Sequence, residues 1–151
     1  MREEYEILLV EDDPVDVELT LHALRGENLS NRIQVARDGE EALDVLFHRV
    51  PRAEGDWGRP PRMILLDLKL PKIDGLEVLR TVKADPRTQA IPVIILTSSR
   101  EERDQVAGYR LGANSYIQKP VDFEQFRQVV KQLGLYWLVV NEPPPRAAFA
   151  P

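Results

Sequence analysis

Cysteine is absent from the 151-residue chain, which excludes disulfide bonds, thiolate metal sites and cysteine nucleophiles. Long apolar runs are absent too: the first residues, MREEYE, lack the apolar core of a signal peptide, and no run approaches the roughly 18 residues of a membrane span. Lysine and arginine form no long basic run, and the formal net charge is −5. We therefore expect a cytoplasmic protein that binds neither membrane nor nucleic acid.

Short apolar segments recur along the chain and are typical of buried strands. The expected strands are Glu6–Val10, Arg32–Ala36, Met63–Asp67, Ile91–Thr97 and, with a weaker pattern, Ser115–Gln118. Apolar residues at helical spacing lie between them. Because each parallel crossover needs a helix-length connection, this alternation predicts an α/β fold: a doubly wound, five-stranded parallel sheet with helices on both faces.

Proline, glycine and charge interrupt this pattern in two segments. Segment 49–61 (RVPRAEGDWGRPP) predicts an exposed loop. Segment 141–151 (NEPPPRAAFAP) has four prolines and little to bury, so we expect it to be poorly ordered. The expected organisation is one domain over residues 1–140, including an extended last helix, followed by this tail.

The last helix carries apolar residues on more than one face. The stripe expected to face the sheet contains Phe123, Phe126, Val130, Leu133 and Trp137. Because a monomer seldom exposes a contiguous apolar patch, we expect a homodimer built on this helix and its extension; the alternative is that the extension folds back on its own subunit. The candidate dimer contacts are Leu135, Tyr136, Trp137, Leu138, Val139 and Val140.

Polar side chains follow the expected strands, at the sheet edge where ligands bind in such folds. They are Glu11, Asp12 and Asp13 after the first strand, Asp67 ending the third, Thr97 and Ser98 ending the fourth, and Lys119 after the fifth. Carboxylates gathered at one edge repel each other and form the anionic, oxygen-lined pocket that a hard divalent cation needs. Mg²⁺ held by Asp12 and Asp67 is therefore expected, whereas Asp13 is interpreted as a helix cap.

The same residues suit phosphoryl transfer to a carboxylate. A divalent cation and the ammonium group of Lys119 would offset the charge on the transferring oxygens, and Thr97 would donate a hydrogen bond. Covalent aspartyl phosphate is an established use of a carboxylate nucleophile.

Four segments resemble the signatures of the response-regulator receiver family, in the family's order. They are Val10–Pro14 (VEDDP), Leu65–Gly75 (LLDLKLPKIDG), Ile95–Ser99 (ILTSS) and Ser115–Pro120 (SYIQKP). The resemblance implies a flavodoxin-like (βα)5 receiver fold in which Asp67 accepts a phosphoryl group from the phosphohistidine of a sensor histidine kinase. It also implies that Glu11 and Asp12 form the acidic pair, and that Thr97 and Lys119 contact the phosphoryl group.

Further details are implied by the resemblance. The backbone carbonyl of Lys69 would also hold the metal. We expect Glu11 to contact the metal either directly or through a water, and Mn²⁺ to be able to replace Mg²⁺. A cis peptide bond is expected between Lys119 and Pro120. Tyr116 would turn inward as Thr97 moves toward the phosphate, changing a protein-binding surface.

Within the family, segment 49–61 and the stretch LYWLVV (135–140) resemble the small regulators that partner phytochrome-type histidine kinases. This resemblance implies such a kinase as donor. We also expect no output domain and no catalysis beyond accepting and losing the protein's own phosphoryl group.

Other functions remain open. A phosphohydrolase with an aspartyl nucleophile usually needs a second Asp two residues later, where this chain has Lys69. A flavodoxin-like cofactor binder would need a glycine-rich loop after Val10, where EDDP would repel a phosphate unless a metal intervened. A phosphate-independent interaction module is the remaining alternative.

Overall fold

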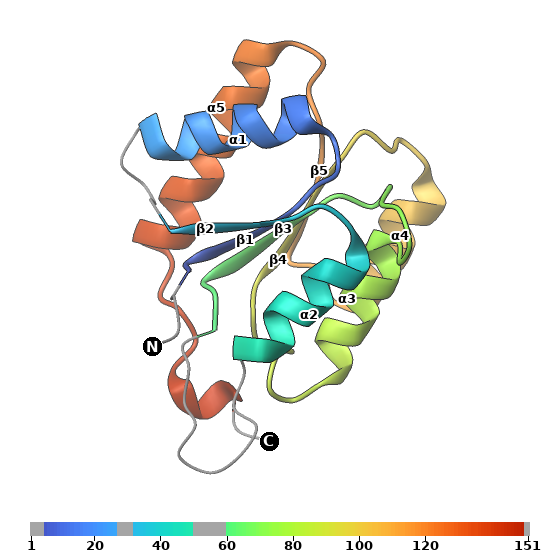
Figure 1. Cartoon of the computed structure of the whole chain (residues 1–151), viewed down its shortest axis with the longest axis vertical. Coiled ribbons are helices and arrows are strands. Elements are labelled where there is room, and N and C mark those ends of the chain that lie inside the picture. Colours follow the sequence, from blue (N-terminus) through green and yellow to red (C-terminus); the bar gives the residue numbers. More distant parts are fainter. Residues whose placement is uncertain (1–4, 27–31, 50–59, 150–151) are drawn as a thin grey trace.

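The computed structural model describes residues 5–26, 32–49 and 60–149, in which strands and helices alternate as predicted (Figure 1). The strands are β1 (Ile7–Val10), β2 (Ile33–Ala36), β3 (Met63–Leu66), β4 (Val93–Thr97) and β5 (Ser115–Gln118). The helices between and after them are α1 (Pro14–Gly26), α2 (Gly39–Arg49), α3 (Gly75–Ala84), α4 (Glu102–Leu111) and α5 (Phe123–Leu135). The observed strands begin or end within two residues of the predicted limits.

All neighbouring strands pair in parallel, in the order β2-β1-β3-β4-β5. The strand order reverses at β1, so right-handed crossovers place helices on both faces. Figure 1 shows α1 and α5 on one face and α2, α3 and α4 on the other. The predicted doubly wound sheet is confirmed.

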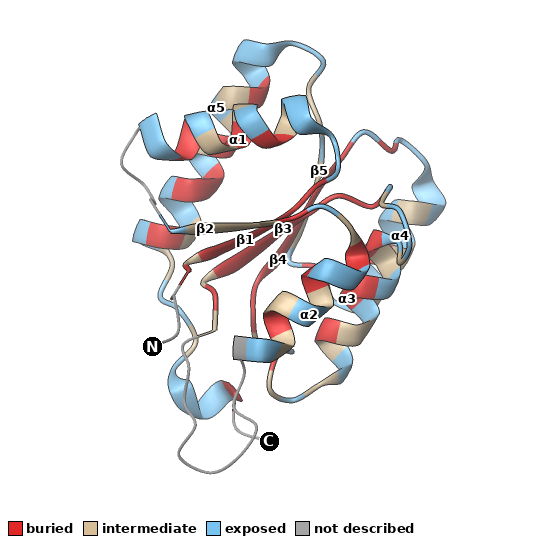
Figure 2. Cartoon of the chain, in the orientation of Figure 1, coloured by how far each residue is buried: buried red, intermediate tan, exposed pale blue. Residues whose placement is uncertain are grey.

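The core lies on both faces of the three central strands, whose residues are buried throughout (Figure 2). Alternate residues belong to different apolar clusters: Leu8 and Leu66 pack with α2 and α3, whereas Leu9 and Leu65 pack with α1 and α5. This explains why the strands read as continuous apolar runs without polar alternation.

The last helix differs from the predicted pattern at both ends. Phe126, Val130 and Leu133 are buried, but Phe123 is 65% exposed because it occupies the first turn, just after the capping residue Asp122. At the other end, α5 continues into a π-helical turn, η1 (Tyr136–Val140). A π turn adds a residue between equivalent positions, so Leu138, five residues after Leu133, reaches the same core.

The candidate dimer residues are therefore divided between two environments. Leu138 is buried in its own subunit, and Trp137 packs against the same core. Leu135, Tyr136, Val139 and Val140 remain exposed, and these four residues are called the η1 patch below.

The segment expected to be poorly ordered is described up to residue 149. It forms a 3₁₀ turn, η2 (Arg146–Phe149), and Phe149 is 5% exposed within the cluster on the α2–α3 face. Phe149 thus gives this segment an apolar anchor that its proline content did not suggest, and the domain boundary at residue 140 stays a prediction. Most of the loop expected over 49–61 lies outside the described residues.

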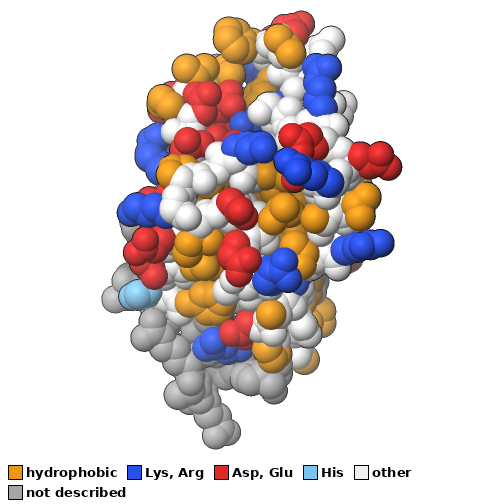
Figure 3. Space-filling view, turned by 90° about the vertical axis from the view of Figure 1, so that its right-hand side faces the viewer, with side chains coloured by type: hydrophobic (Ala, Val, Ile, Leu, Met, Phe, Trp, Pro, Cys, Tyr) orange, Lys and Arg blue, Asp and Glu red, His pale blue; other side chains and the backbone are white. Residues whose placement is uncertain are grey.

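Within the described residues, no helix combines the length and apolar character needed to cross a membrane. Figure 3 shows one side of the molecule, on which Lys and Arg side chains alternate with Asp and Glu and do not gather into one basic area.

Candidate functional site

Backbone pairing at the carboxyl end of the sheet places the predicted site residues. The backbone N–H of Glu11 donates to Ala36 (3.0 Å) and that of Asp67 donates to Val10 (3.1 Å). The N–H of Lys119 donates to the carbonyl of Thr97 (2.7 Å). These bonds extend the sheet ladder beyond the strands, so the side chains start from fixed positions.

Three carboxylates meet at this edge. Glu11, Asp12 and Asp67 each offer an oxygen, and these oxygens lie within 4.8 Å of one another. Glu11 and Asp67 are buried, at 4% and 7% exposure, whereas Asp12 is exposed. Two buried carboxylates beside a solvent-facing one form a donor set that fits a hard divalent cation with part of its shell left to water.

Lys119 neutralises much of this charge. Its Nζ donates to Oε1 of Glu11 (2.5 Å), Oδ2 of Asp16 (2.8 Å) and Oδ2 of Asp67 (3.2 Å). Burial alone would lower the pKa of Lys119, but the hydrogen bonds to Asp16 and Glu11 raise the pKa above its usual value. The ammonium group therefore stays charged throughout the physiological range.

For Glu11, the effect of burial on the pKa outweighs the effect of hydrogen bonding. Burial raises the pKa of Glu11 to about 7, although the hydrogen bond from Lys119 opposes this shift. Oε2 of Glu11 also accepts from the backbone N–H of Asp13 (3.2 Å). Each carboxylate oxygen of Glu11 therefore accepts a hydrogen bond.

Asp67 presents its two oxygens to different groups. Oδ1 accepts from the backbone N–H of Leu68 (2.7 Å) and, more weakly, from that of Lys69 (3.5 Å). Oδ2 faces Lys119. Hydrogen bonds to both oxygens therefore fix the orientation of the Asp67 carboxylate.

A chain of contacts leads from Thr97 to α4 and β5. Thr97 is fully buried, and its Oγ1 accepts from the backbone N–H of Ser99 (3.4 Å). Oγ of Ser99 donates to Oδ2 of Asp104 (2.6 Å), in the first turn of α4. The hydroxyl of Tyr116 donates to the carbonyl of Ser99 (3.4 Å).

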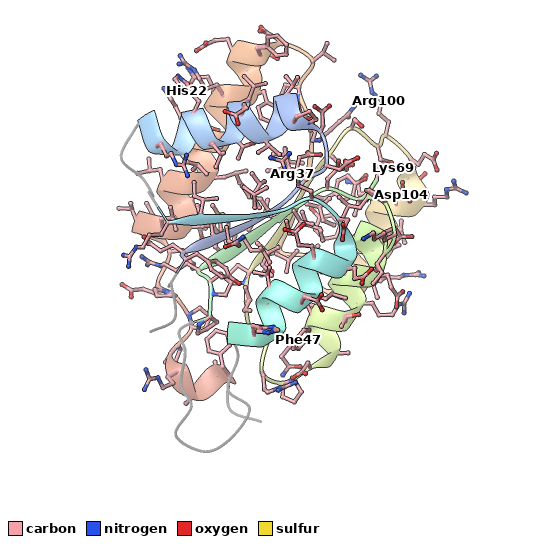
Figure 4. The ribbon with its side chains drawn as sticks, viewed as in Figure 1. His22, Arg37, Phe47, Lys69, Arg100 and Asp104 are labelled. Atoms are coloured by element: carbon pink, nitrogen blue, oxygen red, sulfur yellow. The ribbon has the colours of Figure 1, made fainter. Side chains whose placement is uncertain are left out.

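Asp16 and Asp104 also contact residues of this site, although the sequence did not predict them as site residues. Each lies in the first turn of a helix, where an acidic residue is common for local reasons, so neither stands out as a site residue. Figure 4 labels Asp104 and Lys69 on the side of the molecule where the strands end.

Two backbone features beside the site were also predicted, the cap of α1 and the peptide bond between Lys119 and Pro120. Asp13 caps α1, since its Oδ1 accepts from the backbone N–H of Val15 (2.9 Å), as predicted. The expected cis bond between Lys119 and Pro120 is wrong: the described residues contain no cis bond. An X–Pro bond ordinarily favours trans by about 0.5–1 kcal/mol.

The family model for the response regulator receiver domain matches residues 7–131, which span the whole sheet and every residue of this site. The chain belongs to the response regulator receiver family. The resemblance seen in the four sequence segments is confirmed.

Two curated relatives of this receiver have similar lengths. The probable methanogenesis regulatory protein FilR2 of Methanothrix harundinacea (strain 6Ac) is 42% identical over 139 residues, covering 91% of this chain and 86% of the relative. The response regulator Rcp1 of Synechocystis sp. (strain ATCC 27184 / PCC 6803 / Kazusa) is 37% identical over 134 residues, covering 87% and 88%.

Solved structures agree with the receiver fold. The phosphorylated cyanobacterial phytochrome response regulator RcpA has a TM-score of 0.83 at 37% identity, over 94% of this chain and 100% of that one. The Mn²⁺-bound form of Rcp1 has a TM-score of 0.80 at 34% identity, over 92% and 98%. The bacteriophytochrome response regulator AtBRR is 52% identical, with a TM-score of 0.66 over 92% and 99%.

Proposed function

We propose that Asp67 of this receiver accepts a phosphoryl group from the phosphohistidine of a sensor histidine kinase, and that the modification switches a protein-binding surface. The observation that carries the proposal is the buried carboxylate of Asp67, oriented by a backbone N–H at 2.7 Å and faced by Lys119 at 3.2 Å. Phosphorylated RcpA, a relative of the same fold, supports it.

The transfer step needs little from the protein beyond placement and charge. An oxygen of Asp67 forms the new P–O bond as the P–N bond of the donor breaks. The electron pair of that bond returns to the imidazole nitrogen, which leaves neutral histidine when the ring is protonated at its other nitrogen. Lys119 would pair with a phosphoryl oxygen, and Thr97 would donate its hydroxyl hydrogen bond. No catalysis on another substrate is proposed.

Mg²⁺ is the proposed metal, with Mn²⁺ as a substitute. Asp12, Asp67 and the backbone carbonyl of Lys69 would hold it, and Glu11 would act through a water. When bound, the metal would neutralise charge on the phosphoryl oxygens. The carboxylate cluster and the Mn²⁺-bound form of Rcp1 support this assignment.

A phytochrome-type histidine kinase is the proposed donor, in the cytoplasm. RcpA is a cyanobacterial phytochrome response regulator and AtBRR is a bacteriophytochrome response regulator, and AtBRR is 52% identical to this chain. FilR2, at 42% identity, is a probable methanogenesis regulatory protein, so the test must compare donors. A phytochrome-type kinase domain should phosphorylate this receiver at least about tenfold faster than an unrelated kinase, since cognate selection is a difference in binding free energy.

The switching surface would run from Thr97 to the face formed by α4, β5 and α5. The hydrogen bonds from Ser99 to Asp104 and from Tyr116 to Ser99 provide a route for this change. A Tyr116 ring that keeps one rotamer with and without a phosphate mimic would contradict this part of the proposal. A homodimer through the η1 patch is proposed as well.

Intact mass measurement tests the central step. The wild type incubated with Mg²⁺ and phosphoramidate should gain one phosphoryl group, whereas Asp67→Asn and an EDTA control should gain none. Asp104→Asn is a matched control, since it removes a carboxylate near the site without removing the acceptor. An adduct that persists in Asp67→Asn would refute the assignment of Asp67.

A further inference from the structure

Among the described residues, the ammonium group of Lys119 has three carboxylate partners, and one of them belongs to neither the expected metal site nor the proposed phosphoacceptor. Asp16 lies in the first turn of α1, and its Oδ2 is 2.8 Å from Nζ of Lys119, against 3.2 Å for Oδ2 of Asp67. Of the three side chains, Asp16 is the most exposed, at 21%, against 5% for Glu11 and 7% for Asp67.

A local role in the helix does not account for this contact. An acidic residue in the first turn is favoured by the helix dipole, but Asp13 already caps α1 with its own side chain. The carboxylate of Asp16 instead points across to Lys119, 103 positions later in the chain. It therefore connects α1 with the loop between β5 and α5.

The contact between Asp16 and Lys119 matters because a metal ion and a phosphoryl group would compete with Lys119 for the other carboxylate oxygens. A cation held by the carboxylate cluster and a phosphoryl group on Asp67 would both draw on oxygens that now accept from Lys119. The side chain of Lys119 is only 10% exposed, so an ammonium group that loses two partners needs a remaining one, because an unpaired buried charge is costly. Among the described residues that accept from Nζ of Lys119, Asp16 alone lies outside the proposed metal and phosphoryl positions.

We propose that Asp16 is a positioning residue that receives Lys119 when a divalent cation occupies the carboxylate cluster, and that keeps the ammonium group aimed at the incoming phosphoryl group. This inference rests on the proposed function of the site. Asp16 itself touches neither the metal nor the phosphoryl group.

The first test is a double-mutant cycle on Mg²⁺ affinity, measured by calorimetry. Without Asp16, Lys119 can pair only with the carboxylates that the cation needs, so Asp16→Asn should weaken Mg²⁺ binding about tenfold, as expected for coupled neighbours. In a Lys119→Met background the competitor is gone, and Asp16→Asn should change the affinity by about twofold or less. Glu18→Gln, which removes a charge from an exposed position of the same helix, should have a similarly small effect.

The second test is the rate of phosphorylation by phosphoramidate at saturating Mg²⁺. Asp16→Asn should react about tenfold to a hundredfold more slowly, the scale of losses caused by misplaced groups, whereas Glu18→Gln should match the wild type. Thermal unfolding verifies that each variant is folded. Asp16→Ser, which keeps an oxygen at this helix position, replaces Asp16→Asn if the latter does not fold.

Two results would overturn the inference: Asp16→Asn that behaves like Glu18→Gln in both tests, or an equal loss of Mg²⁺ affinity with and without Lys119. An equal loss in both backgrounds would mean that Asp16 affects Mg²⁺ binding only through its negative charge at a distance, and not through Lys119. Failure of the proposed function looks different, because the wild type itself would then form no adduct while the binding cycle would still report on Asp16.

Discussion

Lys119 is the residue on which the charge balance of the site depends. Lys119→Met would leave the carboxylates of Glu11, Asp16 and Asp67 without their common partner, and removing one member of a buried ion pair typically costs about 3–5 kcal/mol. We expect a loss of about 2–3 kcal/mol in the free energy of unfolding without Mg²⁺, since Glu11 and Asp16 can partly relax toward water. Urea denaturation with and without Mg²⁺ measures this.

Mg²⁺ should restore most of that loss, because a divalent cation replaces the missing positive charge. Lys72→Met is the control: Lys72 is exposed, its ion pairs with Asp38 and Glu40 span 3.7 and 3.9 Å, and such pairs contribute less than about 1 kcal/mol. An equal loss at every Mg²⁺ concentration would mean that Lys119 stabilises the fold independently of the charge in the site.

Lys83 gives the protein a distinct pH dependence in the alkaline range. Its Nζ donates to the carbonyls of Gln89 (2.9 Å) and Ile91 (2.7 Å), which are neutral acceptors. Burial lowers the pKa of Lys83 from 10.5 to about 8. The unfolded chain therefore binds more protons between pH 8 and 10.5, so this group makes the fold more stable as the pH rises through that window.

The comparison with Lys83→Met isolates this effect from other groups that titrate at high pH. Between pH 7.5 and 10.5, the wild type should gain about 1–2 kcal/mol relative to the variant, a value reduced for the partial exposure of the side chain. Chemical denaturation at both pH values measures the difference. A constant difference would show that Lys83 keeps its ordinary pKa in the folded protein.

At the scale of elements, the start of α3 is packed directly against Asp67, the proposed phosphoacceptor. A Cβ atom on Gly75 would lie 2.2 Å from the carbonyl oxygen of Asp67 and 2.6 Å from Cα of Leu68. Both are backbone atoms that cannot rotate away, so Gly75→Ala must shift either α3 or the segment that carries Asp67. We expect a loss of about 2–3 kcal/mol, toward the upper end for overpacking, together with slower phosphorylation of Asp67.

Gly26→Ala is the matched control, since a Cβ there meets nothing within 4 Å and alanine favours the helix by about 0.5–1 kcal/mol. Thermal and urea unfolding of both variants, with the phosphoramidate reaction as second readout, test the pair. Unchanged stability and reactivity of Gly75→Ala would show that this contact is not tight in solution.

The elements that could be predicted from sequence are those fixed by local pattern. The apolar runs around Leu65 and Ile94 identified the central strands because both faces of the sheet are covered, and the strand ends then located Asp67 and Lys119. The direction of a side chain such as Asp16 could not be predicted in this way, because it depends on how α1 is rotated against a loop 103 residues away.

Tertiary packing also determines which apolar side chains are buried near the C-terminus. The helical period placed Leu138 off the core stripe, and only the π turn of η1 brings it inward. Phe149 follows three prolines in a segment expected to have little to bury. One aromatic ring against an existing cluster can nevertheless offset much of the ordering cost of a short turn.

At the scale of the whole molecule, α5 and η1 leave one apolar surface uncovered within the described residues. The η1 patch is 48% to 64% exposed at each of its four residues. Tyr136 packs edge-on against Trp137 with ring centroids 4.9 Å apart, so this part of the patch is a fixed surface, suited to a second copy.

Replacing Val139 and Val140 by lysine together tests the proposed homodimer. Each change removes an apolar side chain worth about 1.5–3 kcal/mol when buried, and like charges would face each other across a twofold axis. The dissociation constant should rise at least about a hundredfold, measured by sedimentation velocity over a range of concentrations.

Val106→Lys is the control, because Val106 is also exposed, at 41%, but lies on α4; it should sediment like the wild type. All variants should unfold within a few degrees of the wild type, since the exposed side chains contribute little to the core. Wild-type protein that sediments only as a monomer at micromolar concentration would exclude the homodimer and leave the η1 patch to a different partner protein. A dimer that survives both lysines would place the interface on another face of the receiver.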